Sequence, residues 1–343
     1  MRFKKTIITA AILAGVVGGT VMYADSRAKF ENTHVKYETS LLEMADIIVT
    51  FAKSDPELRQ PQQPREIVEL TTDIIESNKD KDALYKLGHS TVLFQFKDTL
   101  ILSDPVFGNR ASPVQFAGPE RFDPTPITIE ALPNVSAVIY THDHYDHLHY
   151  GDLMKLKDKV GKFYAPTGVD ERLIRWGVPE SQVVGLSWGE KASVNEGVDV
   201  TLVESQHYSG RTLTDRNSTL WGGWVVEADG KRVYLSGDTG YTQEIFTNIG
   251  DKYNNEFDVA LIESGAYNER WHDIHLLPSE TVEVFKDITG GESDTRLIPI
   301  HQQTFDLALH TFDEPLESLK KELSKEGIDE ALDTPLFGQP YYF

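Results

Sequence analysis

One loop constrains the fold of this chain more than any other feature. Residues Thr141 to His147 read Thr-His-Asp-His-Tyr-Asp-His and directly follow the apolar segment Val135–Tyr140. Such a segment predicts a buried strand, so the loop lies at the carboxyl end of that strand. Imidazoles and carboxylates crowded together in this way are costly unless a cation binds them. Imidazole with carboxylate suits Zn²⁺, with iron or manganese as weaker alternatives, so the sequence predicts a metal site here.

Single histidines and aspartates follow three other predicted strands within a few residues. His207 comes after Val200–Val203, Asp238 after Val233–Leu235 and His301 after Leu297–Ile300. Strand ends that converge on one edge of a sheet would bring these side chains together, and the set suffices for two metal ions. The predicted metal ligands are His142, His144, Asp146, His147, His207, Asp238 and His301.

Short apolar strands and amphipathic helices alternate from Leu84 onward, which indicates an α/β sandwich in one catalytic domain, residues 84–343. Strands are predicted at Thr91–Phe96, Thr99–Leu102, Val135–Tyr140, Val198–Val203, Trp224–Glu227, Arg232–Leu235, Val259–Ile262 and Arg296–Ile300. Helices are predicted at Gly151–Lys159, Asp170–Trp176, Pro278–Lys286 and Pro315–Lys325. The N-terminal extension, residues 29–83, predicts two helices, one with apolar positions from Leu41 to Phe51 and one from Ile67 to Ile74. They pad the core or lie against a membrane.

Composition excludes some functions. The chain of 343 residues has a formal net charge of -21, which disfavours a nucleic-acid substrate. Alternatively, the high surface charge is only a solubility feature. Because there is no cysteine, the chain has neither disulfides nor a Cys-ligated zinc site.

The N-terminal residues 1–28 predict a signal peptide or a membrane anchor. Arg2, Lys4 and Lys5 precede an uncharged run from Thr6 to Ala24, which as a helix is roughly 28 Å long and barely spans a bilayer. Basic residues before such a run place the rest of the chain outside the cytoplasm. Cleavage and retention of the run both stay open.

The ligand pattern resembles that of the metallo-β-lactamase superfamily, whose fold is a four-layer αββα sandwich. The resemblance implies one metal ion on His142, His144 and His207. It implies a second ion on Asp146, His147 and His301, with Asp238 bridging the two. In such pairs the ions share an acidified water whose hydroxide is the nucleophile.

A longer series of segments, from about Leu84 to about Pro315, resembles the phospholipases D that hydrolyse N-acyl-phosphatidylethanolamine and their bacterial relatives. The resemblance implies hydrolysis of such lipids to N-acylethanolamine and phosphatidic acid, contact with a membrane surface, and a homodimer. Tyr208 and Gln302-Gln303 depart from the family pattern in places that could line the pocket. The segments include Gly88-His89-Ser90-Thr91, Asp104-Pro105-Val106-Phe107, Gln206-His207-Tyr208-Ser209-Gly210-Arg211 and His275-Leu276-x-Pro278.

Two further histidines have expected roles. By the resemblance, His275 lies close to the metals and suits a general acid for the leaving alcohol; capping of the following helix is the structural alternative. His89 is expected to orient the metal loop. Two alternative functions also stay open: a lactone or other carboxyl-ester hydrolase with the same metal pair, and a membrane-tethered metal-binding protein without turnover.

Overall fold

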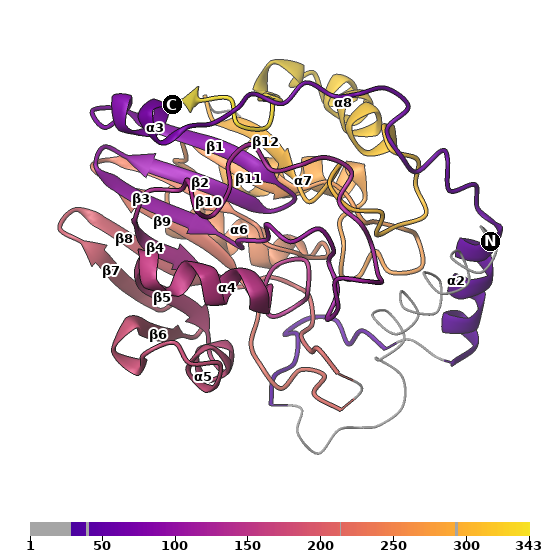
Figure 1. Ribbon diagram of the computed structural model, residues 1–343. Coiled ribbons are helices and arrows are strands. Elements are labelled where there is room, and N and C mark those ends of the chain that lie inside the picture. The colour runs from indigo at the N-terminus through magenta and orange to yellow at the C-terminus, as the bar shows by residue number, and fades with distance from the viewer. Residues whose placement is uncertain (1–28, 39–40, 213, 292–293) are drawn as a thin grey trace.

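The computed structural model describes residues 29–38, 41–212, 214–291 and 294–343, arranged as two facing β-sheets with helices on both outer sides (Figure 1). The predicted signal or anchor run, Thr6–Ala24, lies outside the described residues. Among the residues that are described, no helix has the length and apolar character needed to cross a membrane.

The first sheet is mixed. Its strands β1, β2 and β3 are antiparallel, and β3 to β6 continue in parallel. The order is β13-β1-β2-β3-β4-β5-β6. The strands are β1 (Asp82–Gly88), β2 (Thr91–Phe96), β3 (Thr99–Ser103), β4 (Val135–Ile139), β5 (Val160–Pro166), β6 (Val183–Leu186) and β13 (Tyr341–Tyr342).

The second sheet is also mixed. Strands β7 to β10 are antiparallel, and β10 to β12 are parallel. The order is β12-β11-β10-β9-β8-β7. The strands are β7 (Lys191–Asn195), β8 (Val198–Val203), β9 (Gly223–Ala228), β10 (Lys231–Leu235), β11 (Val259–Glu263) and β12 (Arg296–Ile300).

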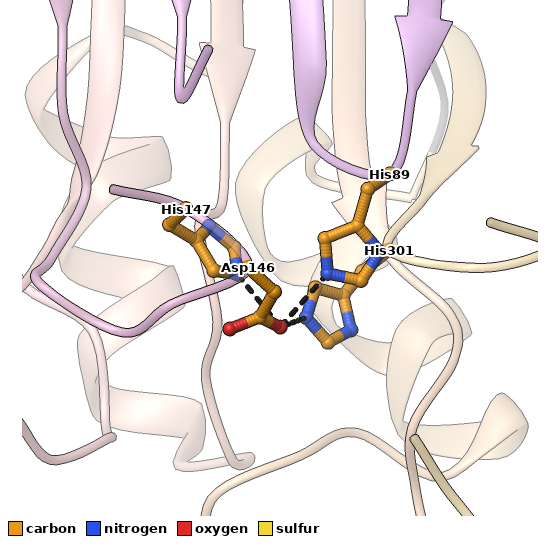
Figure 2. Close-up of side chains that lie close together, drawn as sticks. All are labelled: His89, Asp146, His147 and His301. Atoms are coloured by element: carbon orange, nitrogen blue, oxygen red, sulfur yellow. Dashed lines mark hydrogen bonds and ion pairs between the residues drawn. The ribbon is translucent and has the colours of Figure 1, made fainter. Parts of the chain in front are cut away.

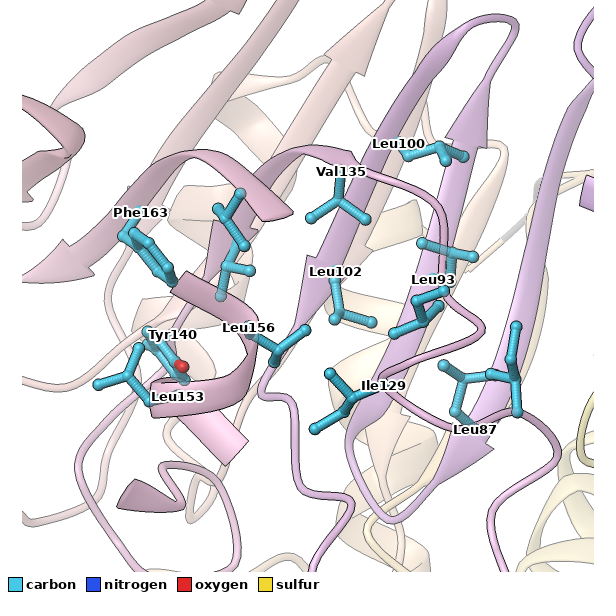
Figure 3. Packing of buried hydrophobic residues seen from close by; sticks show 14 of the residues in the cluster. Leu87, Leu93, Leu100, Leu102, Ile129, Val135, Tyr140, Leu153, Leu156 and Phe163 are labelled. Atoms are coloured by element: carbon cyan, nitrogen blue, oxygen red, sulfur yellow. The ribbon is translucent and has the colours of Figure 1, made fainter. Parts of the chain in front are cut away.

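Side chains along each strand point alternately to its two faces, and this separates three hydrophobic cores: one between the two sheets and one between each sheet and its helices. On β2, Leu93 packs under the outer helices while Phe94 faces the other sheet, because successive side chains point to opposite faces. Figure 3 shows the outer core of the first sheet, where Leu153 and Leu156 of a helix cover the strands. The first sheet is covered by α3 (Thr72–Ser77), α4 (Tyr150–Leu156) and α5 (Val169–Arg175); the second is covered by α6 (Gln243–Lys252), α7 (Pro278–Thr289) and α8 (Glu314–Glu326). The predicted four-layer αββα sandwich is confirmed.

The N-terminal extension differs from its prediction. The first helix is present as α2 (Leu41–Lys53), but the second is wrong over its first half. Val68 and Leu70 are extended there, and their backbone N–H groups donate to Phe337 and Pro126. Partners in distant loops therefore override a helical spacing that is only a few residues long.

Several elements were not predicted. Strands β1, β5, β6 and β7 and helix α6 are all additional. Because β1 begins at Asp82, the predicted boundary between residues 83 and 84 falls inside a strand.

Candidate metal centre

The carboxyl ends of the strands converge on one rim of the sandwich. β4 leads into the loop of His142, His144, Asp146 and His147, and β8, β10 and β12 lead to His207, Asp238 and His301. The structure brings all seven predicted ligands together there. They form two adjoining groups, and Asp238 lies between them. Asp238 and His301 also belong to a third cluster of possible ligands, with Glu263 and His275.

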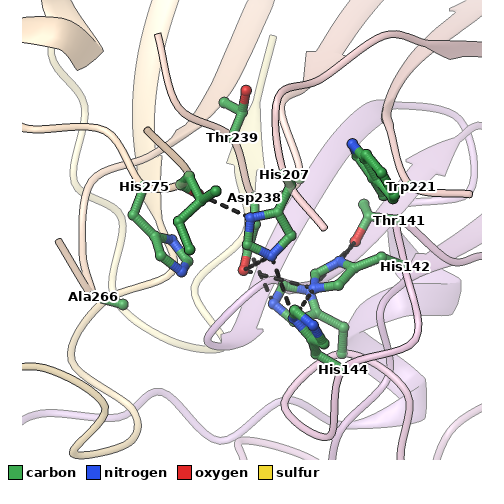
Figure 4. Close-up of polar contacts among 12 residues, drawn as sticks. Thr141, His142, His144, His207, Trp221, Asp238, Thr239, Ala266 and His275 are labelled. Carbon is green, nitrogen blue, oxygen red and sulfur yellow. Dashed lines mark hydrogen bonds and ion pairs between the residues drawn. The ribbon is translucent and has the colours of Figure 1, made fainter. Parts of the chain in front are cut away.

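The first group is the histidine half-site: His142, His144 and His207, with Asp238 at its side (Figure 4). His142 Nε2 lies 2.9 Å and His207 Nε2 lies 3.3 Å from His144 Nδ1. Asp238 Oδ2 is 3.7 Å from both Nε2 atoms. Three imidazole nitrogens and one carboxylate oxygen therefore face one point.

The second group is the carboxylate half-site: Asp146, His147 and His301, with His89 beside them (Figure 2). Asp146 Oδ2 lies 3.4 Å from His301 Nε2 and 3.6 Å from His147 Nε2. Asp238 reaches this group too, with Oδ1 3.2 Å from His147 Nε2 and Oδ2 3.1 Å from His301 Nε2. Its position between the groups is the one expected of a bridging ligand.

Both groups fit metal ions. Donor atoms about 2.0–2.2 Å from a tetrahedral zinc ion lie about 3.3–3.6 Å from one another, close to the separations found here. His147 Nε2, His301 Nε2 and Asp238 Oδ1 are buried and have no hydrogen-bond partner among the described residues. Buried polar atoms without a partner are costly, and a cation between them would remove that cost.

The histidine half-site holds neutral imidazoles. Burial lowers the pKa of His142 and of His207 well below the usual value, and lowers the pKa of His144 to about 4. These rings are therefore unprotonated at neutral pH, which is the form that binds a metal ion.

The carboxylate half-site has the opposite character. Burial disfavours charge on its histidines, but Asp238 and Asp146 outweigh it, raising the pKa of His147 well above its usual value and that of His301 to about 10. Without a metal ion, protons on these rings balance the two carboxylates. The half-site thus requires positive charge from protons or from a cation.

Asp104, at the end of β3, orients the imidazole rings of His147 and His142 through contacts on the side of their Nδ1 atoms. Its buried carboxylate accepts hydrogen bonds from the Nδ1 atom of His147 at 2.8 Å and from the backbone N and the hydroxyl of Thr141. The Thr141 oxygen in turn lies 3.0 Å from His142 Nδ1. These contacts fix the ring orientations that point Nε2 of both histidines into the site.

His207 is oriented from another side. Its Nδ1 donates to the carbonyl of Ile274 at 2.9 Å, leaving Nε2 for the site. Asp143, the remaining carboxylate of the loop, pairs with Arg172 at 3.0 Å and accepts from the backbone of Gly210. It therefore ties the metal loop to the loop of His207 and lies outside both ligand groups.

His89 takes the orienting place expected of it. Its Nε2 lies 2.9 Å from Asp146 Oδ2, and burial lowers its pKa to about 3, so the neutral ring donates to the carboxylate. His89, Asp104 and His301 have φ angles of 52°, 36° and 60°, in the left-handed region. Non-glycine residues there cost about 1–3 kcal/mol each and cluster at functional sites.

His275 lies between the two half-sites, and its position depends on a residue that the sequence did not reveal. The ring is 5.1 Å from the His207 ring and 5.3 Å from the His301 ring. Its Nδ1 lies 2.9 Å from Oε2 of Glu263, a buried carboxylate at the end of β11. Oε1 of Glu263 accepts from the backbone of Thr239 and Leu276, so this carboxylate is fixed and holds the His275 ring by Nδ1.

Comparison with known proteins identifies the family to which the fold belongs. Residues 99–302 match the family model described as the beta-lactamase superfamily domain. The chain is 41% identical to an uncharacterized protein of Mycobacterium tuberculosis over 72% of this chain and 66% of that protein. It is 36% identical to N-acyl-phosphatidylethanolamine-hydrolyzing phospholipase D 1 of Caenorhabditis elegans, covering 68% of each chain. The solved structure of a metallo hydrolase of Ignicoccus hospitalis superposes with a TM-score of 0.57 at 23% identity, over 77% of this chain and 98% of the other.

The chain therefore belongs to the metallo-β-lactamase superfamily. Within it, the chain is related to a phospholipase D that is named for the hydrolysis of N-acyl-phosphatidylethanolamine, and it spans 66% of the length of the mycobacterial relative.

Proposed function

We propose that this protein hydrolyses a phosphodiester of the N-acyl-phosphatidylethanolamine type, releasing N-acylethanolamine and phosphatidic acid. The observation that supports it most is the joint presence of two complete half-sites and 36% identity to a phospholipase D of that specificity. Water adds its oxygen to phosphorus, and the bond from phosphorus to the ethanolamine oxygen breaks.

The metal centre would hold two ions, with zinc favoured by the ligand set over iron or manganese. A bound pair would acidify a water and neutralise charge on the phosphate oxygens. His142, His144 and His207 would hold one ion and Asp146, His147 and His301 the other, and Asp238 lies where it could serve both.

His275 would supply the proton for the leaving alcohol. Glu263 holds its Nδ1, so a proton on Nε2 points away from that carboxylate, on the side of the two half-sites. An alkoxide is a poor leaving group, and a positioned acid of this kind contributes substantially to its departure.

A lipid surface is the proposed setting. Helix α2 packs Ile47 in one small core with Trp271 and Ala308 beside the metal centre, while Leu42 is 84% and Val49 46% exposed. The two residues are seven positions apart and lie on the same face of the helix, and exposed apolar side chains on one face support contact with lipid. The uncharged run Thr6–Ala24 supports a place outside the cytoplasm, at the membrane or released after cleavage.

The test is hydrolysis of vesicles that contain N-acyl-phosphatidylethanolamine by the full-length chain, metal-loaded and after chelation. Asp146→Asn removes a ligand, and Asp229→Asn, an exposed carboxylate that pairs with Lys97, serves as its control. We expect N-acylethanolamine and phosphatidic acid from the loaded wild type and the control alone. If two metal ions bind and the lipid stays intact, the lipid assignment is wrong, and lactones and small phosphodiesters become the substrates to test.

A further inference from the structure

Residues 29–38 lie directly on the loop that carries His207, although they precede it by more than 160 residues. We call this segment the N-terminal strap. It has no helix or strand, bends at Thr33 and His34, and is attached at three points to residues 207–217. No family pattern in the sequence pointed to it.

The central attachment is made by Asn32. Its side-chain Nδ2 donates to the carbonyl of His207 at 2.8 Å, and its Oδ1 accepts from the backbone N–H of His207 at 3.0 Å. A side-chain amide thus exchanges two hydrogen bonds with one residue, as paired residues do in an antiparallel sheet. His207 lies in a loop, outside any strand, so the amide of Asn32 substitutes for a neighbouring strand.

The outer attachments hold Asn32 in place. At one end, the backbone N–H groups of Lys29 and Phe30 both donate to the carbonyl of Asn217. At the other end, Arg216 donates to the carbonyl of Tyr37 at 3.0 Å. The Arg216 guanidinium also lies 4.7 Å from the ring of Tyr208, which packs on His144.

We infer that Asn32 is a positioning residue for the metal ligand His207. The His207 ring is held at Nδ1 by Ile274, and its backbone is held by Asn32, so the direction of Nε2 is fixed from both sides. Loss of the amide frees the backbone and leaves the ring with one restraint. Partners of this kind change metal affinity by about 10–100-fold when they are removed. The inference rests on the proposed metal centre and not on the lipid substrate.

The test is metal uptake by the full-length chain, stripped of metal and titrated with Zn²⁺ against a chromophoric chelator. Asn32→Ala is expected to weaken one of two equivalents by about 10–100-fold and to leave the other unchanged. His207→Ala identifies that equivalent, because it should remove it. Lys36→Ala is the matched control: this strap residue is exposed and pairs with Glu38 at 2.7 Å, so both equivalents should bind as in the wild type.

Hydrogen exchange of the metal-free proteins provides a readout independent of any metal ion. Asn32→Ala should speed exchange in the peptide around His207 and leave the strands of both sheets protected, because the accepted bond belongs to the His207 N–H. Unchanged affinity for both equivalents in Asn32→Ala would overturn the inference. So would loss of cooperative unfolding in that variant, since Asn32 would then hold the whole fold. A wild type that binds fewer than two ions would remove the premise, whatever its activity on lipid.

Discussion

The two half-sites of the metal centre are built from the same residue types and have opposite electrostatic character. The rings of His142, His144 and His207 are neutral because burial dominates. The rings of His147 and His301 retain protons because neighbouring carboxylates, Asp238 and Asp146 for both and Asp104 for His147, raise their pKa values more than burial lowers them. The difference teaches that the number of carboxylates, and not the number of histidines, decides whether an empty half-site already holds positive charge.

Asp238 is the ligand whose carboxylate oxygens face both half-sites, so its loss should give the largest effect. Asp238→Asn removes the shared negative charge and replaces one of two oxygens, of which Oδ1 faces His147 and Oδ2 faces His301. We expect weaker binding of both metal ions and a fall in kcat/KM of at least about 10³-fold. Metal content and hydrolysis are measured together, with Asp229→Asn as control. Loss of a single ion would show that Asp238 serves one half-site.

The pH dependence of metal uptake should separate the half-sites. His301, with a pKa of about 10, is protonated at pH 7 and must release its proton to a metal ion, whereas His144, with a pKa of about 4, is already neutral. Affinity at the carboxylate half-site should rise about tenfold per pH unit for each displaced proton between pH 7 and 9, and stay flat at the histidine half-site.

The stability of the metal-free protein should change in the same pH range. The pKa values of His147 and His301 are raised in the folded state, so their protonated rings contribute fully to the free energy of unfolding below about pH 6.5. That contribution is lost as the pH rises through the folded-state pKa, which is about 10 for His301.

For metal uptake, calorimetric titration in buffers of different ionisation enthalpy counts the protons that each metal ion releases on binding. Equal release by both equivalents would contradict the contrast between the half-sites.

Asp104 should affect the two half-sites unequally. It contacts His147 directly and His142 only through Thr141. Asp104→Asn is expected to weaken the ion at the carboxylate half-site by about 10–100-fold and the other ion less. The same chelator titration measures both, and Asp333→Asn, in an ion pair with Arg296, is the control. Equal weakening of both ions would mean that the contact through Thr141 transmits the whole effect of Asp104 to His142.

The sequence predicted the ligands because each of them follows an apolar strand within a few residues. That pattern predicts which side chains lie at the ends of strands, and the αββα arrangement brings the ends of β4, β8, β10 and β12 to one rim. Asp104 and Glu263 follow apolar strands in the same way, but their partners His147 and His275 come from other segments, so only the fold shows which rings they hold. Asn32 is still harder to recognise from the sequence, since the residue that it contacts lies 175 positions away.

The missed elements have physical reasons too. β7 is an edge strand with exposed and half-buried residues in alternation, and it lacks the apolar run that marks the central strands. The N-terminal segment around Val68 is extended because loops of the folded domain supply its hydrogen bonds. The left-handed backbone of His89, Asp104 and His301 is likewise imposed by the assembled rim, since local preference disfavours it.

Glu263 should give the smallest effect, and it tests the residue that lies between the half-sites. Glu263→Gln removes the charge that holds His275 by its Nδ1, while both ligand groups keep all their members. We expect metal content to stay at the wild-type value and kcat to fall by about 10-fold on a substrate with an alkoxide leaving group. On a substrate that releases a nitrophenolate, which needs no proton, the loss should vanish. His275→Ala should show the same dependence on the leaving group. If Glu263→Gln instead lost metal, the carboxylate would act on the nearby His301, whose Nδ1 is 3.8 Å away, and its place would be with the carboxylate half-site.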